Sequence, residues 1–120
     1  MSWEHGAGKR ILVVEHDALT RGAIKMLLEW ADYQVECAAG GEEALGLLLR
    51  GLRPALILLD ARMPGCDGWC FREEQRADPD LADIPVVVIS GADAASLDAA
   101  GHIRKPFEPA ELLEQVWQHG

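Results

Sequence analysis

Apolar residues cluster along this chain in two different patterns. Short runs in which nearly every residue is aliphatic occupy positions 11–14, 55–59 and 86–89. Such a run is typical of a strand that is covered on both faces, as in a parallel sheet. Residues 33–38 (YQVECA) alternate between apolar and polar side chains, which favours an edge strand. Residues 102–104 (HIR) are a fifth and shorter candidate strand.

Stretches with helical spacing separate these candidate strands. Asp17 can cap a first helix, whose expected inner stripe is Leu19, Ala23, Met26, Leu27 and Trp30. Residues 42–50 predict a second helix, with an inner face of Ala44, Leu45, Leu48 and Leu49. Residues 68–77 predict a third helix, which is apolar only near its start. Residues 109–118 predict the last helix, with an inner face of Leu112, Leu113, Val116 and Trp117.

Strands and helices that alternate in this way predict an α/β fold, in which a parallel sheet lies between two helical layers with right-handed crossovers. The chain has 120 residues, of which 49% are apolar, and this fits one compact domain with a sizeable core. We expect the domain to span residues 9–119 and residues 1–8 to form a flexible N-terminal tail.

Composition and charge narrow the possible partners and setting. Twenty acidic and eleven basic residues give a net charge of −9, which argues against a nucleic-acid partner because phosphate contacts need clustered Lys and Arg. No apolar run approaches the roughly 18 residues that span a bilayer, and the N-terminus lacks the apolar core of a secretion signal. The cysteines, Cys37, Cys66 and Cys70, show no disulfide spacing, which suits a reducing compartment. A cytoplasmic protein without a membrane partner is expected.

Polar residues follow the apolar runs at the points where the strands should end. Glu15 follows the first run, Asp60 the third, Ser90 the fourth and Lys105 the short fifth candidate. The carboxyl ends of parallel strands share one edge of the sheet, and ligands of open α/β sheets bind there. We therefore expect these four residues, together with Asp17, to meet in one shallow crevice.

The side chains expected in this crevice indicate a type of chemistry. Acids that are crowded together repel one another and favour a proton or a cation between them. Oxygen ligands suit Mg²⁺, which keeps several waters and uses a few carboxylates together with phosphate oxygens. An amine and a hydroxyl that face the same crevice can bind an anion. This combination describes a place where a phosphoryl group could be carried by a carboxylate.

Four motifs, in the right order, give the chain a specific resemblance to the receiver domain of two-component response regulators. They are ILVVEHD at 11–17, LILLDARMPGCDGW at 56–69, VVVISGAD at 86–93 and RKPFEPAEL at 104–112. The resemblance covers about residues 9–119. It implies a flavodoxin-like three-layer sandwich with a five-stranded parallel sheet in the order 2-1-3-4-5.

The resemblance also implies roles for the residues of the crevice. Asp60 would accept a phosphoryl group from a histidine kinase or a phosphotransfer protein. Ser90 would bond a phosphoryl oxygen and move with it as a switch residue. Lys105 would pair with the phosphoryl group, aimed by a cis peptide bond to Pro106. The chain would then be a signalling domain rather than an enzyme, beyond its own phosphoryl uptake and hydrolysis.

The implied metal site departs from the family at one ligand. Mg²⁺, or Mn²⁺ or another divalent ion, would be held by Glu15, Asp60 and the backbone carbonyl of Arg62, but His16 stands where the family has a metal-binding Asp. Imidazole is a poor ligand for Mg²⁺ and a common one for Zn²⁺ and Cu²⁺. Three interpretations stay open: His16 weakens the metal site, it recruits a transition metal or supplies its own positive charge, or the site no longer takes phosphate.

Two further departures concern the surface that would carry the signal. His102 stands where the family has an aromatic switch residue. Only fourteen residues separate Ser90 from Lys105, and the family has about seven more, roughly two helical turns. The fourth helix of the family is therefore expected to be shortened or absent.

These observations predict a single-domain response regulator. Its output would be docking to an unknown downstream protein, since no effector domain follows residue 120. The alternative is a pseudo-receiver, a binding module that uses the same fold without phosphorylation. His16 and the short fourth helix favour the alternative, whereas Asp60, Ser90 and Lys105 oppose it.

Overall fold

A computed structural model describes residues 8–91 and 94–120 of the chain. Its strands are β1 (Arg10–Val14), β2 (Gln34–Ala38), β3 (Leu56–Asp60), β4 (Val86–Ser90) and β5 (Gly101–Arg104). Its helices are α1 (Ala18–Trp30), α2 (Gly41–Leu49), α3 (Gly68–Ala77) and α4 (Pro109–His119). Every predicted strand and helix is present. The predicted tail lies outside the described residues except for Gly8, whose N–H donates to the carbonyl of Asp32 (3.0 Å).

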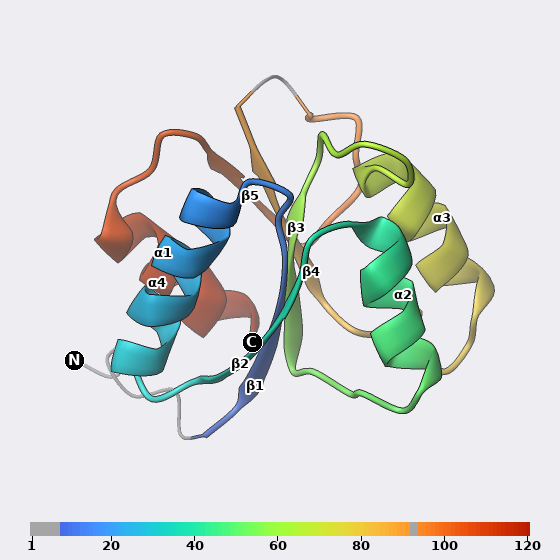
Figure 1. Cartoon of the computed structure of the whole chain (residues 1–120), viewed down its shortest axis with the longest axis horizontal. Helices are drawn as coiled ribbons and strands as arrows, with labels where there is room; N and C mark the ends of the chain where they lie inside the picture. The colour runs from blue at the N-terminus through green and yellow to red at the C-terminus, as the bar shows by residue number, and fades with distance from the viewer. Residues whose placement is uncertain (1–7, 92–93) are drawn as a thin grey trace.

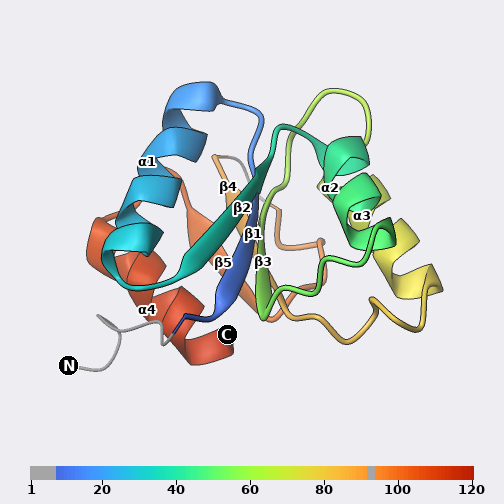
Figure 2. The same ribbon diagram turned by 60° about the horizontal axis from the view of Figure 1, so that its bottom comes forward.

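The five strands form one parallel sheet in the order β2-β1-β3-β4-β5. Figure 1 shows α1 and α4 on one face of this sheet and α2 and α3 on the other. The turned view in Figure 2 shows the same three layers, with the twisted sheet between the two pairs of helices. The predicted flavodoxin-like sandwich is therefore confirmed. None of the helices in the described ranges has the length and the apolar content needed to cross a bilayer.

The three central strands are buried on both faces because four of the five side chains in each are apolar. Alternate residues of β1 point to opposite sides, so Ile11 and Val13 pack with α1 and α4, while Leu12 and Val14 pack with α2 and α3. The same division holds along β3 and β4. Two apolar cores result, one on each side of the sheet.

The inner face of α1 differs from the predicted one. Ile24 and Leu28 are the buried residues of this helix, whereas Leu19, Met26 and Trp30 have exposed fractions of 85%, 73% and 62%. The sequence of α1 carries two apolar stripes, and helical periodicity alone does not indicate which of them faces the sheet.

Two other residues that we predicted to face inward are exposed, and each lies near the end of its helix. Leu49 of α2 is 73% exposed and Trp117 of α4 is 41% exposed. The other predicted inward residues of α4, Leu112, Leu113 and Val116, are buried. Both errors fall in the last turns of their helices.

A shortened or absent helix was predicted between β4 and β5, and the described residues of this connection, 91 and 94–100, form only turns, bends and irregular backbone. Ala94 and Leu97 are buried against the α2–α3 side of the sheet and take the place of a helix face. The polar contacts that hold this connection include two hydrogen bonds to its carbonyls: His102 Nε2 donates to Leu97 (2.9 Å) and Arg72 Nε donates to Asp98 (2.9 Å).

Candidate functional site

Four predicted site residues lie together at the carboxyl edge of the sheet. Glu15, Asp60 and Ser90 directly follow or end β1, β3 and β4, and their exposed fractions are only 0%, 3% and 6%. Lys105 follows β5, and its backbone N–H donates to the carbonyl of Ser90 (2.8 Å). Burial of ionisable side chains is costly unless they are paired, so the contacts within this group decide its charge state.

Glu15 is the most deeply buried acid of the group. The Lys105 ammonium lies 2.7 Å from Glu15 Oε1, and the backbone N–H of Asp17 donates to Glu15 Oε2 (3.0 Å). Burial raises the pKa of the Glu15 carboxyl, and the nearby Asp60 raises it further, while the contacts with Lys105 and with the Asp17 N–H lower it. The upward effects win, so this carboxyl holds a proton more strongly than an exposed one.

Asp60 lies at the end of β3 with both carboxylate oxygens in contact with donors. Asp60 Oδ2 is 3.0 Å from His16 Nδ1. Asp60 Oδ1 accepts the backbone N–H of Arg62 (3.3 Å) and lies 3.7 Å from the Lys105 ammonium. An ionised carboxylate can only accept, so the contact with His16 is a hydrogen bond when the imidazole carries its hydrogen on Nδ1. The 3.7 Å distance shows that the amine of Lys105 points toward Asp60, as the predicted phosphoryl site requires.

His16 completes a group of possible metal ligands. Its side chain is 48% exposed, and Nδ1 lies 3.7 Å from Glu15 Oε2. One donor atom from each of Glu15, His16 and Asp60 lies within 4.8 Å of the others. Two buried carboxylates that repel one another fit a divalent cation. The imidazole is the one donor of this group that suits a transition metal better than Mg²⁺.

Two other predicted features of the site have different outcomes. The Lys105–Pro106 peptide bond is cis, as predicted. Asp17 does not join the cluster of acids, because its carboxylate caps α1 by accepting from the N–H (2.9 Å) and the hydroxyl (2.6 Å) of Thr20. These hydrogen bonds also lower the pKa of Asp17.

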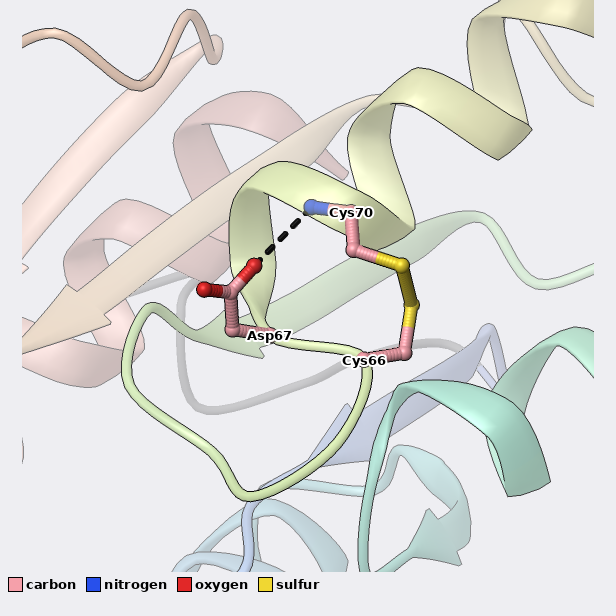
Figure 3. The surroundings of a disulfide bond; sticks show 3 residues. All are labelled: Cys66, Asp67 and Cys70. Carbon is pink, nitrogen blue, oxygen red and sulfur yellow. Dashed lines mark hydrogen bonds between the residues drawn. A yellow bond between two sulfur atoms is a disulfide. The ribbon is translucent and has the colours of Figure 1, made fainter.

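The loop after β3 contains a feature that contradicts the sequence analysis. Cys66 and Cys70 form a disulfide (Figure 3), whereas we expected no disulfide spacing. Asp67 is the N-cap of α3, and its carboxylate accepts the N–H of Cys70 (3.0 Å). The first turn of the helix therefore brings two cysteines four residues apart to a Cα distance of 5.2 Å. Cys37 is the free cysteine.

An apolar groove beside the site was missed by the sequence analysis. It has a volume of about 690 Å³ and lies between α1 and the segment that connects β5 to α4. Its lining residues are Leu19, Thr20, Ala23, Ile24, Leu27, Lys105, Pro106, Phe107 and Pro109. The apolar residues Leu19, Ala23 and Leu27 of α1 could have indicated this groove, but the sequence analysis predicts that they face the core.

Comparisons with known proteins agree on one family. The response regulator receiver domain matches residues 11–117. The response regulator MprA of Mycobacterium sp. (strain KMS) is 35% identical over 114 residues, which cover 89% of this chain and 48% of that protein. The chain thus spans about half the length of the curated relatives it matches.

Solved structures show the same fold. The receiver domain of a sensor histidine kinase from Pseudomonas aeruginosa, with a magnesium ion coordinated in its active site cleft, is 25% identical with a TM-score of 0.86, and the match covers 93% of this chain and 97% of that one. The response regulator TrrA of Thermotoga maritima, in complex with Mg²⁺ and BeF, is 31% identical with a TM-score of 0.82 and coverages of 93% and 99%. The chain belongs to the response regulator receiver domain family of two-component signal transduction.

Proposed function

We propose that Asp60 is a phosphoacceptor and that the chain is switched by its phosphorylation. The observation that carries this proposal is the position of the Lys105 ammonium, 2.7 Å from Glu15 and 3.7 Å from Asp60 at the same sheet edge. An amine beside a buried carboxylate can neutralise the oxygens of an incoming phosphoryl group, which is the main catalytic need of phosphoryl transfer. The family membership of the chain supports the same reading.

The proposed step is a direct transfer to an Asp60 oxygen. This oxygen attacks the phosphorus of a phosphohistidine, a P–O bond forms, the P–N bond breaks, and the imidazole leaves with the bonding electrons. Lys105 moves from Glu15 to a phosphoryl oxygen, which balances the added negative charge. Ser90 lies at the end of β4 next to β3, and we assign its hydroxyl to a second phosphoryl oxygen as the switch contact. His102, bonded to the carbonyl of Leu97, is the proposed second switch residue.

The metal expected for such a site would be held by Glu15, Asp60 and the carbonyl of Arg62, with His16 at the remaining protein position. A bound Mg²⁺ or Mn²⁺ supplies charge that neutralises the phosphoryl oxygens. His16 and Lys105 already contact the two carboxylates, at distances of 3.0 and 2.7 Å. A cation must displace these contacts, and we propose that its affinity is lower than in receivers with an Asp at this position, by about 10–100-fold.

The apolar groove beside Lys105 is the proposed docking surface for the phosphodonor. The exposed Leu19 of α1 lines it, together with Phe107. Exposed apolar surface of this kind marks interaction sites, and a donor protein bound there would bring its phosphohistidine to the sheet edge that holds Asp60. We propose a histidine kinase or a phosphotransfer protein as the donor, a downstream protein as the recipient of the signal, and the cytoplasm as the location.

The test is the intact mass of the chain after incubation with a small acyl phosphate and Mg²⁺ or Mn²⁺. The wild type should gain one phosphoryl group, and Asp60→Asn should gain none. Asp80→Asn is a matched control, because this exposed carboxylate lies in the connection that precedes β4, at the opposite end of that strand from Ser90; it should gain the phosphoryl group. Folding of each variant is checked by circular dichroism.

One observation favours the pseudo-receiver as a second candidate function. The hydrogen bond from His16 to Asp60 (3.0 Å) occupies the proposed nucleophilic carboxylate. If the wild type gains no mass at millimolar metal, while the folded His16→Asp variant does, the chain is a pseudo-receiver that this histidine has inactivated. Phosphorylation of both proteins would exclude it.

A further inference from the structure

The disulfide between Cys66 and Cys70 links the end of the β3–α3 loop to the first turn of α3 (Figure 3). Cys66 is 7% exposed and belongs to the core beneath α2 and α3. Its main chain also lies against α2, since a Cβ placed on Gly41 would come within 2.4 Å of the Cys66 carbonyl oxygen. One half of the disulfide is therefore held firmly in the core.

The other half faces the solvent. Cys70 is exposed on the first turn of α3, whereas Cys66 is buried, so we expect a thiolate from outside to attack the Cys70 sulfur. Exposed disulfides are the labile ones, and a thiolate is favoured near a helix N-terminus. This difference between the two sulfurs gives thiol–disulfide exchange a single direction of attack.

The disulfide is connected to the phosphoacceptor by a short chain of contacts. The N–H of Gly68 donates to the carbonyl of Ala61 (3.0 Å) and closes the loop that begins next to Asp60. Trp69 lies between the two cysteines in the sequence, and the Arg62 guanidinium stacks 4.6 Å from the centre of its ring. The N–H of Arg62 in turn donates to Asp60 Oδ1. A change in the first turn of α3 therefore acts on the backbone that positions the acceptor.

We propose that Cys66 and Cys70 form a thiol–disulfide exchange site whose redox state sets the order of the loop beside Asp60. Its reaction partner is a dithiol, either a small molecule or a protein. Oxidised, the disulfide fixes the first turn of α3 and with it the contact between Trp69 and Arg62. Reduced, the turn is held by the Asp67 cap and the core contacts of Cys66, and the loop gains freedom. In the cytoplasm, which is the location proposed above, the disulfides that do occur are usually transient and catalytic or redox-sensing.

The exchange balances in atoms and electrons. A thiolate of the dithiol attacks Cys70 Sγ, the S–S bond breaks, and Cys66 Sγ leaves as a thiolate that takes up a proton. The second thiol of the reductant then attacks the reductant's other sulfur, which is bonded to Cys70 in the mixed disulfide, and Cys70 is released. The chain gains two electrons and two protons, and the dithiol loses them as it becomes a cyclic disulfide.

The thiol chemistry is tested by alkylation of the full chain. The protein is equilibrated at a series of ratios of oxidised to reduced dithiothreitol, quenched in acid, alkylated with iodoacetamide in denaturant and weighed intact. The oxidised chain should gain one alkyl group, at the free Cys37, and the reduced chain three. The Cys37→Ala variant should gain no alkyl group when it is oxidised and two when it is reduced. Two alkyl groups on Cys37→Ala at every ratio, including fully oxidised dithiothreitol, would overturn the proposal.

The effect on the loop is tested by hydrogen exchange and by the fluorescence of Trp69. Reduction should make the amides of residues 68–70 exchange about tenfold faster and should shift the Trp69 emission, a change that Trp69→Phe lacks. Cys70→Ala should exchange fast at every ratio. Equal exchange and emission in the oxidised and reduced wild type would overturn the coupling to the loop.

The consequence for signalling rests on the proposed function and is measured separately. The rate at which the chain gains phosphoryl mass should differ between the oxidised and the reduced wild type and should be independent of redox state in Cys70→Ala. Equal rates in the two redox states would overturn control of the acceptor. A chain that gains no phosphoryl mass in either state would refute the proposed function, while the alkylation and exchange results would still decide the redox site.

Discussion

The substitution His16→Asp tests the assignment of the metal site by converting its one nitrogen donor into a carboxylate. In the wild type, His16 Nδ1 lies 3.0 Å from Asp60 Oδ2 and 3.7 Å from Glu15 Oε2. A carboxylate at the same position places a third acid next to two buried ones. The variant should therefore be less stable without metal and should bind Mg²⁺ more tightly.

The size of both effects follows from these distances. Two unit charges about 4 Å apart interact by about 4 kcal/mol at an effective dielectric constant near 20. The side chain of His16 is 48% exposed, so solvent reduces the repulsion to about 0.5–1.5 kcal/mol for each of the two pairs. Without metal, the free energy of unfolding should fall by about 1–3 kcal/mol. A regained ligand should tighten Mg²⁺ binding at least about tenfold, which corresponds to about 1.4 kcal/mol.

Urea unfolding with increasing Mg²⁺ measures both quantities in one experiment. A metal that binds only the folded state raises the free energy of unfolding by about 2.7 kcal/mol at a concentration of 100 Kd, so the Mg²⁺ dependence gives Kd. His16→Asn is the matched control, because it removes the imidazole without adding a charge, and its Kd should stay near that of the wild type. Equal Mg²⁺ midpoints for wild type and His16→Asp would refute the placement of His16 at the metal.

Three further predictions concern stability. Leu28→Ala should lower the free energy of unfolding by about 2–5 kcal/mol because the Leu28 side chain is fully buried. Leu19→Ala should change it by less than about 0.5 kcal/mol because the Leu19 side chain is exposed. Equal losses in urea unfolding would contradict the observed orientation of α1. Gly22→Ala should stabilise the folded chain by about 0.5–1 kcal/mol, because a Cβ at this position meets nothing within 4 Å. Gly41→Ala should destabilise it, because a Cβ there would lie 2.4 Å from a backbone carbonyl oxygen. A rise in the thermal midpoint of both variants would be inconsistent with that close approach. The raised pKa of Glu15 means that the folded state binds the carboxyl proton more tightly than the unfolded state does. The contribution of Glu15 to stability therefore decreases as the pH rises from the ordinary pKa of this group, 4.5, through its raised pKa in the folded state. Unfolding in chelator across this range should show a stability difference between wild type and Glu15→Gln that moves against the wild type as pH rises, and a constant difference would refute the shift.

The fold could be predicted because its main signals are local in the sequence. The aliphatic runs of β1, β3 and β4 have one physical explanation, which is burial on both faces of a sheet. The polar residues at the ends of these strands then meet because parallel strands end at the same edge. Glu15, Asp60 and Lys105 were found in this way, and the structure brings them together within 2.7–3.7 Å.

Other features depend on contacts that a single sequence does not determine. The choice between the two apolar stripes of α1 is made by the packing of Ile24 and Leu28 against the sheet. The carboxylate of Asp17 could either join the acid cluster or cap α1, and the nearby N–H groups at the helix start decide for the cap. The Cys66–Cys70 pair becomes close only when the turn at Asp67 is formed.

The central claim is that Asp60 carries the phosphoryl group, and the most direct measurement locates the modification on the chain. Borohydride reduces an aspartyl phosphate to homoserine, so treatment of the phosphorylated protein followed by peptide mass mapping identifies the modified residue. We predict homoserine at position 60 and at no other acid, with a yield that falls when Lys105 is replaced by Ala. Homoserine at another position, or none in a chain that has gained phosphoryl mass, would contradict the account.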